Sequence, residues 1–288
     1  MGGLPHYDAR VDEQPDDQTL PAADAPDAGD VSDVSDAGDV GDVGGAADAS
    51  VPPTRRKAHE VPDLPEGVSP ARVRSFVRRG RLSTLTLDRM ETLAPARALP
   101  PGPFDPAAAF GRVAPVVLEI GCGHGHAAIA YAATHPEHDL LAMDVHTPGV
   151  ARMLADAEKA GVPNLRVEVG DAVVFLEERV GDGVLDVVHL FFPDPWRKTK
   201  HTKRRFVSPT NLDLLARVLK PGGHVLVATD QDFYAEHVLD EVATHPRFTA
   251  RRVERPAWRP GDGFEAKGLR AGRTINELRL DLVPVDPA

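Results

Sequence analysis

The stretch from 116 to 229 alternates short apolar runs with segments whose apolar residues recur at helical spacing. The apolar runs predict strands, and the segments between them predict helices. Strands that are apolar throughout are typical of a parallel sheet covered by helices on both faces. The alternation therefore predicts an α/β fold with a doubly wound, mostly parallel sheet.

The apolar runs predict a seven-stranded sheet with strands at 116–120, 140–145, 165–169, 184–192, 224–229, 248–254 and 276–282. The helical segments predict helices at 127–134, 149–160, 172–179, 211–219 and 233–244. Residues 94–110 are rich in Pro and Ala and predict a loop that leads into the sheet domain.

Carboxylates lie at the carboxyl ends of three predicted strands, where ligands bind in folds of this kind. Glu119 lies near the end of the first strand, just before Gly121 and a series of alternating glycines. A carboxylate at this point would repel a phosphate, so it favours a cationic ligand such as S-adenosyl-L-methionine. Asp144 ends the second strand, where it could accept from ribose hydroxyls. Asp171 follows the third, where it could accept from an adenine amino group or simply cap the next helix.

The segment LFFPDPWRKTKHTKRRF, residues 190–206, joins a buried strand to a rigid turn and then to a cationic patch. The turn presents the carboxylate of Asp194 beside Trp196. The patch consists of Arg197, Lys198, Lys200, Lys203, Arg204 and Arg205. This combination predicts a site for a flat base and its phosphates, with Trp196 either stacked on the base or packed under the turn. A strand end followed by a solvated Lys/Arg loop is the alternative.

The net charge of -11 is concentrated in the first fifty residues, which hold twelve Asp and one Glu against one Arg. The remainder of the chain is close to neutral, so its clustered cations can bind nucleic acid. Residues 1–65 cannot bury enough apolar surface to offset the entropy of ordering, which predicts a disordered acidic tail before a domain at 66–288. A basic element around 72–82 is either an RNA-contacting arm or a solvated helix face.

Cys122 is the single cysteine, so an intrachain disulfide or a Cys-based zinc site is excluded. A reducing cytoplasm fits this composition. The sequence has no signal-peptide pattern and no apolar run of about eighteen residues, so we expect no membrane contact. We also expect no metal, no obligate protein partner and a monomeric chain.

Six motifs, in this order, resemble those of the bacterial tRNA (guanine-N7-)-methyltransferases: LEIGCGHG, MDVH, NLRVEVGDA, LFFPDPWRKTKHTKRR, VATD and GFEAKG. The resemblance covers about residues 72–283, and FFPDPW with the cationic segment after it is its most specific part. It implies a Rossmann-like class I methyltransferase that uses S-adenosyl-L-methionine to methylate N7 of a guanine in the variable loop of tRNA.

The resemblance also implies roles for individual residues. Glu119, Gly121, Asp144, Asp171 and Asp194 would bind the methyl donor, and Asp194 would also be the catalytic residue. The substrate would contact Lys198, Asp230, Phe264 and Glu265. The chain departs from the family pattern at Asp144, where Glu is common, and at Asp262-Gly263, where the family usually has Thr-Lys.

Three further questions stay open at this point. Asp230 could instead cap the helix that starts near Phe233. The late arginines could extend the tRNA surface or be solvated: Arg251, Arg252, Arg255, Arg259 and Arg270. The turn also resembles that of enzymes that methylate exocyclic amino groups, and a catalytically silent tRNA-binding module of the same fold is the other alternative.

Overall fold

The computed structural model describes residues 82–284. The predicted acidic tail at 1–65 lies outside the described residues, as does the basic element around 72–82 except for its last residue. The boundary between tail and domain at residue 66 therefore stays a prediction.

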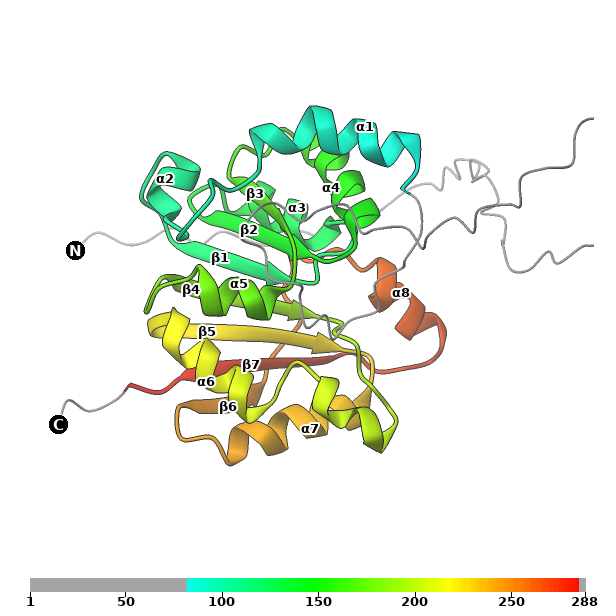
Figure 1. Cartoon of the computed structure of the whole chain (residues 1–288). Helices are drawn as coiled ribbons and strands as arrows, with labels where there is room; N and C mark the ends of the chain where they lie inside the picture. The colour runs from blue at the N-terminus through cyan, green and yellow to red at the C-terminus, as the bar shows by residue number, and fades with distance from the viewer. Residues whose placement is uncertain (1–81, 285–288) are drawn as a thin grey trace, which may run out of the picture. The chain divides into compact units, whose positions relative to one another are not determined.

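Seven strands form one mixed sheet with the order β3-β2-β1-β4-β5-β7-β6 (Figure 1). The strands are β1 (Val116–Ile120), β2 (Asp139–Asp144), β3 (Leu165–Val169), β4 (Leu185–Phe191), β5 (Leu219–Thr229), β6 (Phe248–Arg252) and β7 (Asn276–Leu282). Among the strands of residues 82–284, only β7 runs antiparallel to its neighbours, β5 and β6. The strand order reverses between β1 and β4, so the doubly wound α/β prediction is confirmed. Such a reversal opens a crevice at the carboxyl ends of the strands.

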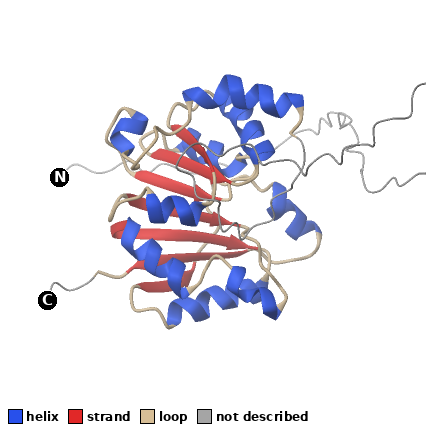
Figure 2. Cartoon of the chain, in the orientation of Figure 1, coloured by secondary structure: helices blue, strands red, loops and turns tan. Residues whose placement is uncertain are grey.

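Helices cover both faces of the sheet (Figure 2). They are α1 (Thr84–Leu93), α2 (Pro106–Phe110), α3 (His126–Thr134), α4 (Thr147–Ala160), α5 (Ala172–Glu178), α6 (Pro209–Val218), α7 (Asp232–Ala243) and α8 (Gly263–Arg270), with short 3-10 turns η1 (Ala94–Ala96) and η2 (Thr199–Arg204). One apolar cluster packs α3 and α4 on β1, β2 and β3, and α1 adds Met90 and Leu93 to it. The other packs α5, α6 and α7 on the opposite face. α8 belongs to neither layer and lies beyond the carboxyl ends of the strands (Figure 1).

Strand β1 shows why the predicted strands are apolar at every position. Val117 belongs to the core under α3 and α4, whereas its neighbour Leu118 belongs to the core under α5 and α6. Successive side chains of a strand point to opposite faces, so a strand covered on both sides must be apolar throughout. Both residues are fully buried, and each contributes about 1.5–3 kcal/mol of transfer free energy.

Two local predictions were wrong, and two helices were not predicted. The segment predicted as a loop contains α2, because Asp105 accepts from the amides of Ala107 and Ala108 and Pro106 has the backbone angle of a first helical residue. β5 begins at Leu219 rather than at residue 224 and continues through the Pro-Gly-Gly segment. Gly223 makes this continuation possible, since a Cβ there would lie 3.0 Å from the carbonyl oxygen of Asp186. The sequence analysis predicted neither α1 nor α8.

Within residues 82–284, no helix is long and apolar enough to cross a membrane.

Candidate functional site

A cavity of about 330 Å³ opens at the carboxyl edge of the sheet, where the loops after β1, β2, β3 and β4 meet. It is lined by Ile120, Gly121, Gly123, Met143, Asp144, Val145, His146, Gly170, Asp171, Ala172, Val173, Leu190, Phe191, Phe192, Pro193, Asp194, Trp196, Arg204, Phe206, Asn211 and Phe264. Of the predicted site residues, Gly121, Asp144, Asp171, Asp194 and Phe264 are therefore brought together. Its size falls in the range of small-molecule sites.

The glycine loop between β1 and α3 gives the cavity a wall of bare backbone. Gly121 and Gly123 have φ of 76° and 56°, which side chains other than glycine rarely adopt. The loop also fits closely against α4, because a Cβ on Gly149 would lie 2.6 Å from the carbonyl oxygen of Gly123. A ligand can consequently approach the main chain of this loop.

Asp144 and Asp171 reach the cavity from the ends of β2 and β3, and both have local backbone partners. Asp144 accepts from the Gly123 amide through Oδ2 at 2.7 Å and from the His146 amide through Oδ1 at 2.8 Å. Asp171 caps α5 by accepting from the Val173 amide at 2.8 Å. The predicted capping role is thus confirmed, and it coexists with a place in the cavity wall. These bonds hold both carboxylates in fixed orientations, and carboxylate oxygens can accept further hydrogen bonds.

The turn after β4 is strained. Phe192 and Trp196 have φ of 50° and 43°, a region that bulky side chains seldom occupy and that is often found at functional sites. Arg205 holds the turn by donating Nε to the Pro195 carbonyl at 3.1 Å. The guanidinium of Arg204 lies over the Trp196 ring, 4.8 Å from its centroid. The turn exposes Asp194 at the cavity, and the half-buried Trp196 lines the cavity as well.

Glu119 does not line the cavity, although its neighbours Ile120 and Gly121 do. Its side chain is buried, and Oε2 has no hydrogen-bond partner among the described residues. Burial raises the pKa of Glu119 to about 8, with Arg259 opposing and Asp144 adding to the shift. The role of Glu119 toward a methyl donor remains a prediction.

His189 lies beside Glu119, with Nδ1 3.8 Å from Oε2 of the carboxyl group. Its ring stacks on Phe191 and on Trp258, and both ring nitrogens lack partners within the described part of the chain. Burial, together with the nearby charge of Arg259, lowers the pKa of His189 to about 3. The imidazole is therefore neutral at physiological pH. No motif in the sequence pointed to this residue or to Trp258.

The other predicted substrate residues lie outside the cavity wall. Lys198 is exposed just before η2. Asp230 accepts from Arg273 Nε at 2.7 Å and does not cap α7, so the capping alternative was wrong. Glu265 is buried and accepts from Arg255 and Arg259. Phe264, by contrast, leaves 66% of its surface exposed at the cavity.

Most of the late arginines form ion pairs with carboxylates, and the sequence analysis did not predict these pairs. Arg251 pairs with Asp281, Arg252 with Glu236, and Arg255 with Glu265. Arg259 is buried and pairs with Glu265 and Glu277, so neither expectation for it, a tRNA surface or a solvated side chain, was right.

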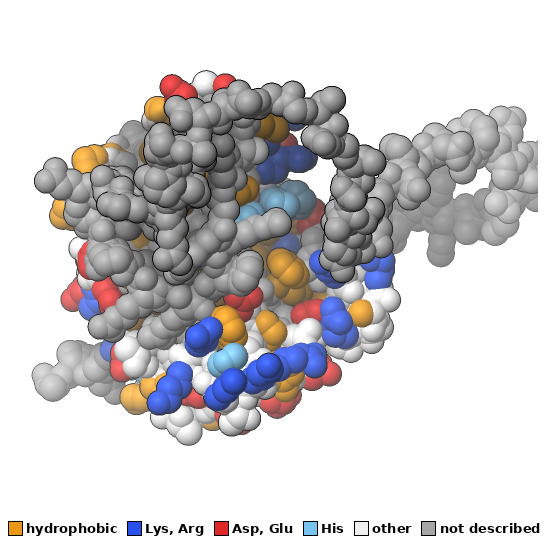
Figure 3. Space-filling model, turned by 45° about the vertical axis from the view of Figure 1, so that its right-hand side comes forward, with side chains coloured by type: hydrophobic (Ala, Val, Ile, Leu, Met, Phe, Trp, Pro, Cys, Tyr) orange, Lys and Arg blue, Asp and Glu red, His pale blue; other side chains and the backbone are white. Residues whose placement is uncertain are grey.

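The cationic patch predicted from the sequence is largely exposed next to the cavity. Arg197, Lys198, Lys200, Lys203 and Arg204 are all exposed, and Arg204 also lines the cavity. Lys and Arg side chains form a band across the face shown in Figure 3. No group of three or more His, Cys, Asp or Glu side chains in residues 82–284 could hold a metal ion.

The chain is similar in sequence to known methyltransferases. The family described as "Putative methyltransferase" matches residues 113–278. The tRNA (guanine-N(7)-)-methyltransferase of Sodalis glossinidius is 44% identical over 221 residues, covering 74% of this chain and 92% of the relative. That of Nitrosomonas europaea is 40% identical over 212 residues, covering 72% and 95%.

Among solved structures, the 16S rRNA methyltransferase KamB matches 65% of this chain and 99% of its own, with 19% identity and a TM-score of 0.47. The sequence relatives extend over most of both chains. On these matches, the chain belongs to the family of bacterial tRNA (guanine-N7-)-methyltransferases.

Proposed function

We propose that this protein transfers the methyl group of S-adenosyl-L-methionine to N7 of a variable-loop guanine in tRNA. The observation that carries the proposal is the meeting of Asp144, Asp171 and Asp194 in one cavity, beside Trp196 and an exposed cationic segment. Family membership supports the choice of reaction, since the relatives named above are tRNA (guanine-N(7)-)-methyltransferases.

The residues present fit a cationic donor that carries a ribose and an adenine. Bare backbone at Gly121 and Gly123 lets the donor approach closely. Asp144 would accept from the ribose hydroxyls and Asp171 from the adenine amino group. The buried Oε2 of Glu119, which has no hydrogen-bond partner within residues 82–284, lies one residue from the cavity wall, and a cationic group nearby would favour its carboxylate form.

S-adenosyl-L-methionine supplies a methyl group on a sulfonium, whose departure leaves a neutral thioether. Guanine N7 has an in-plane lone pair at neutral pH, so it attacks without a general base. The contribution of the protein is then mainly positioning, with nitrogen, methyl carbon and sulfur held in line. Asp194 would hold the guanine by accepting from the N–H donors of its Watson–Crick edge and would offset the positive charge that develops on the ring.

The surrounding residues would hold the tRNA around this centre. Trp196 and Phe264 offer ring faces at the cavity for stacking on bases, a contact worth about 1–3 kcal/mol per base. Lys198 and the exposed cations of the same segment would bind phosphates. Asp230 and Glu265 are engaged with arginines, so we assign them an indirect role in placing α8.

The deciding experiment is methyl transfer to unmodified tRNA from labelled S-adenosyl-L-methionine. We expect N7-methylguanosine by mass and strand breakage at that nucleotide after borohydride and aniline treatment. Methylation of an exocyclic amino group would instead establish a different RNA base methyltransferase. Donor and tRNA binding without transfer would establish the silent binding module.

We further propose that the activity resides in residues 66–288, that the chain acts as a monomer without an obligate partner, and that it acts in the cytoplasm, where tRNA is modified. Truncation at residue 66 should leave transfer to tRNA intact. Light scattering across a range of concentrations should give the mass of one chain.

A further inference from the structure

Arg259 is a buried arginine in the connection between β6 and α8, and it joins two separate elements. Its Nε and Nη2 donate to Oε2 of Glu265 at 3.1 and 3.0 Å. Its Nη1 donates to Oε2 of Glu277 at 2.9 Å, and Nη2 also donates to Oε1 of that residue. Because Glu265 lies on α8 and Glu277 on β7, the guanidinium fixes α8 to the sheet.

The flat face of the same guanidinium covers the end of β4. Its carbon lies 4.9 Å from the ring centroid of Phe191 and 5.6 Å from that of Phe192. Both rings line the cavity, and Phe192 is one of the two strained residues of the turn that carries Asp194. Planar stacking of this kind is a property of arginine that lysine lacks. Arg259 therefore contacts the base of the turn as well as α8.

Helix α8 contributes Phe264 to the cavity wall. Phe264 directly precedes Glu265, the residue that pairs with Arg259. Its other end is fixed independently, where Arg273 donates to Asp230 at 2.7 Å. Gly268 permits this close approach, since a Cβ there would lie 2.7 Å from Cβ of Asp230. The helix thus has two fixed points, and the one next to the cavity is Arg259.

A buried ion network of this kind is a weak stabiliser, because desolvation of the charges offsets most of their attraction. Apolar side chains of similar volume would hold the elements together equally well. What the network adds is geometry, since the arginine fork and the two carboxylates fit in one arrangement. Arg259 also acts on the site electrostatically, because it opposes the burial that raises the pKa of Glu119.

We propose that Arg259 is a positioning residue for methyl transfer, which sets the place of Phe264 relative to the turn that carries Asp194. Arg259 does not line the cavity and acts through Glu265, Phe191 and Phe192. The inference rests on the proposed function, because it concerns the same cavity and the same reaction.

The test compares two variants with wild-type full-length protein. Arg259→Lys keeps the buried charge but loses the fork and the flat face. Arg259→Met combined with Glu277→Gln removes one charge of each sign and leaves Glu265 paired with Arg255. The second variant covers the case in which the first does not fold.

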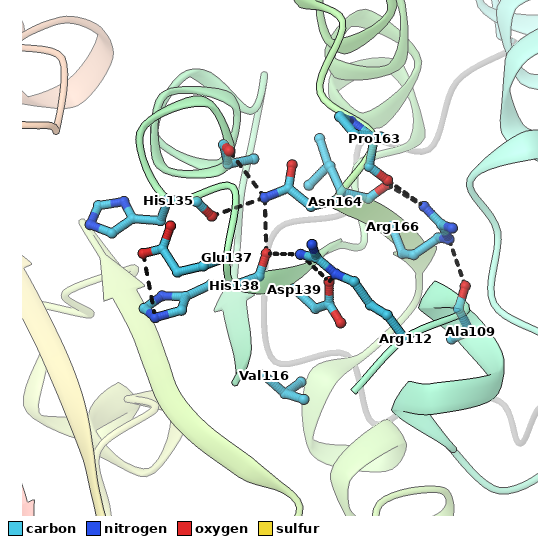
Figure 4. Close-up of polar contacts among 12 residues, drawn as sticks. Ala109, Arg112, Val116, His135, Glu137, His138, Asp139, Pro163, Asn164 and Arg166 are labelled. Atoms are coloured by element: carbon cyan, nitrogen blue, oxygen red, sulfur yellow. Dashed lines mark hydrogen bonds and ion pairs between the residues drawn. The ribbon is translucent and has the colours of Figure 1, made fainter. Parts of the chain in front are cut away.

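Arg112→Lys is the matched control, because Arg112 also bridges two groups but lies at the opposite edge of the sheet (Figure 4). Its Nε donates to Asp139 at 2.7 Å and its Nη2 to the His138 carbonyl at 2.9 Å. The measurements are the thermal midpoint, the dissociation constant for S-adenosyl-L-methionine, and the single-turnover rate on tRNA per donor-binding site.

We expect both Arg259 variants to bind the donor within about threefold of wild type and to lose about 10- to 100-fold in single-turnover rate, as small misplacements of reacting groups do. Arg112→Lys should lower the thermal midpoint and leave the rate unchanged. An Arg259 variant with a normal rate per donor-binding site would overturn the proposal, and so would failure of both variants to fold. Inactive wild-type protein would instead reject the proposed function, and with it this inference.

Discussion

At the amino edge of the sheet, polar side chains bind the chain itself. Asn164 donates Nδ2 to the carbonyl oxygens of Ala132, His135 and His138 at 2.9–3.1 Å (Figure 4). Asp186, at the start of β4, accepts from the Val116 amide at 2.7 Å and from Lys220 at 2.6 Å. These contacts join strand ends and loops, so the polar side chains of this edge stabilise the fold.

The carboxyl edge of the sheet differs from the amino edge in the exposure, backbone strain and pairing of its residues. Asp194 is exposed at a cavity, and the turn that carries it includes two bulky residues at positive φ. Glu119 and His189 are buried with polar atoms that lack partners among residues 82–284. Unpaired buried polar atoms and backbone strain each cost free energy. Within residues 82–284, both non-glycine residues at positive φ lie at this edge, where a ligand can offset the cost of their strain. Buried polar atoms without partners are less localised, since Asp139 and Arg247 have them at the amino edge.

The largest expected effect tests the difference between the two edges with one substitution near each end of β4. Asp194→Ala should lower turnover on tRNA by about 100-fold or more, because the base loses its orientation, with little change in donor affinity. Asp186→Ala, at the other end of the strand, should lower the thermal midpoint and leave turnover per folded molecule unchanged. Steady-state kinetics beside a thermal melt checks both, and near-normal turnover by Asp194→Ala would remove the catalytic role.

The next effect concerns stability at the amino edge. Asn164→Ala removes a donor that three carbonyl oxygens share, of which those of His135 and His138 keep a second donor, so we expect the free energy of unfolding to fall by about 1–3 kcal/mol. Donor affinity and single-turnover rate should be unchanged. Denaturant unfolding gives the free energy. A rate loss in folded Asn164→Ala would show that the two edges are coupled.

A pH series sharpens the comparison at Glu119 and His189. The folded protein holds a proton on Glu119 up to about pH 8, whereas the unfolded chain releases it near 4.5. The folded protein keeps His189 neutral down to about pH 3, whereas the unfolded chain binds a proton below 6.5. Between pH 4.5 and 6.5 the two contributions oppose each other, and above 6.5 only that of Glu119 remains.

Without ligand, the free energy of unfolding should therefore fall by about 2 kcal/mol from pH 6.5 to 8, because the folded state binds more protons than the unfolded state in this range. Glu119→Gln should flatten this fall. Asn164→Ala removes no titratable group and should keep the wild-type slope. Thermal melts across the pH range measure it, and a Glu119→Gln curve parallel to wild type would contradict the assignment.

The smallest effect is expected on the surface. Lys200→Ala should weaken tRNA binding a few-fold and reduce the slope of log affinity against log salt by about 1, because one phosphate contact is lost. Lys159→Ala removes an exposed lysine at the end of α4 and should leave the slope unchanged. Filter binding at several salt concentrations tests this, and equal slopes for the two variants would place the RNA elsewhere.

The sequence predicted the strands and helices that carry the site because local patterns encode them. β1, β3 and β7 have the predicted bounds, since each is an apolar or alternating run ended by glycine, asparagine or another turn signal. Helix α8 was missed because its place is set by pairs between distant segments, Arg259 with Glu277 on β7 and Arg273 with Asp230, which leave no local pattern in the sequence.

By itself the sequence determined the doubly wound fold and the gathering of Asp144, Asp171 and Asp194 at one edge. Periodicity fixes strands and helices, and parallel strands bring their carboxyl ends together. Only the tertiary structure decided which charged groups face the cavity and which are buried in pairs. Glu265 and Arg259 look like surface residues in the sequence, yet they neutralise each other in the interior, because side-chain pairing across segments leaves no local pattern.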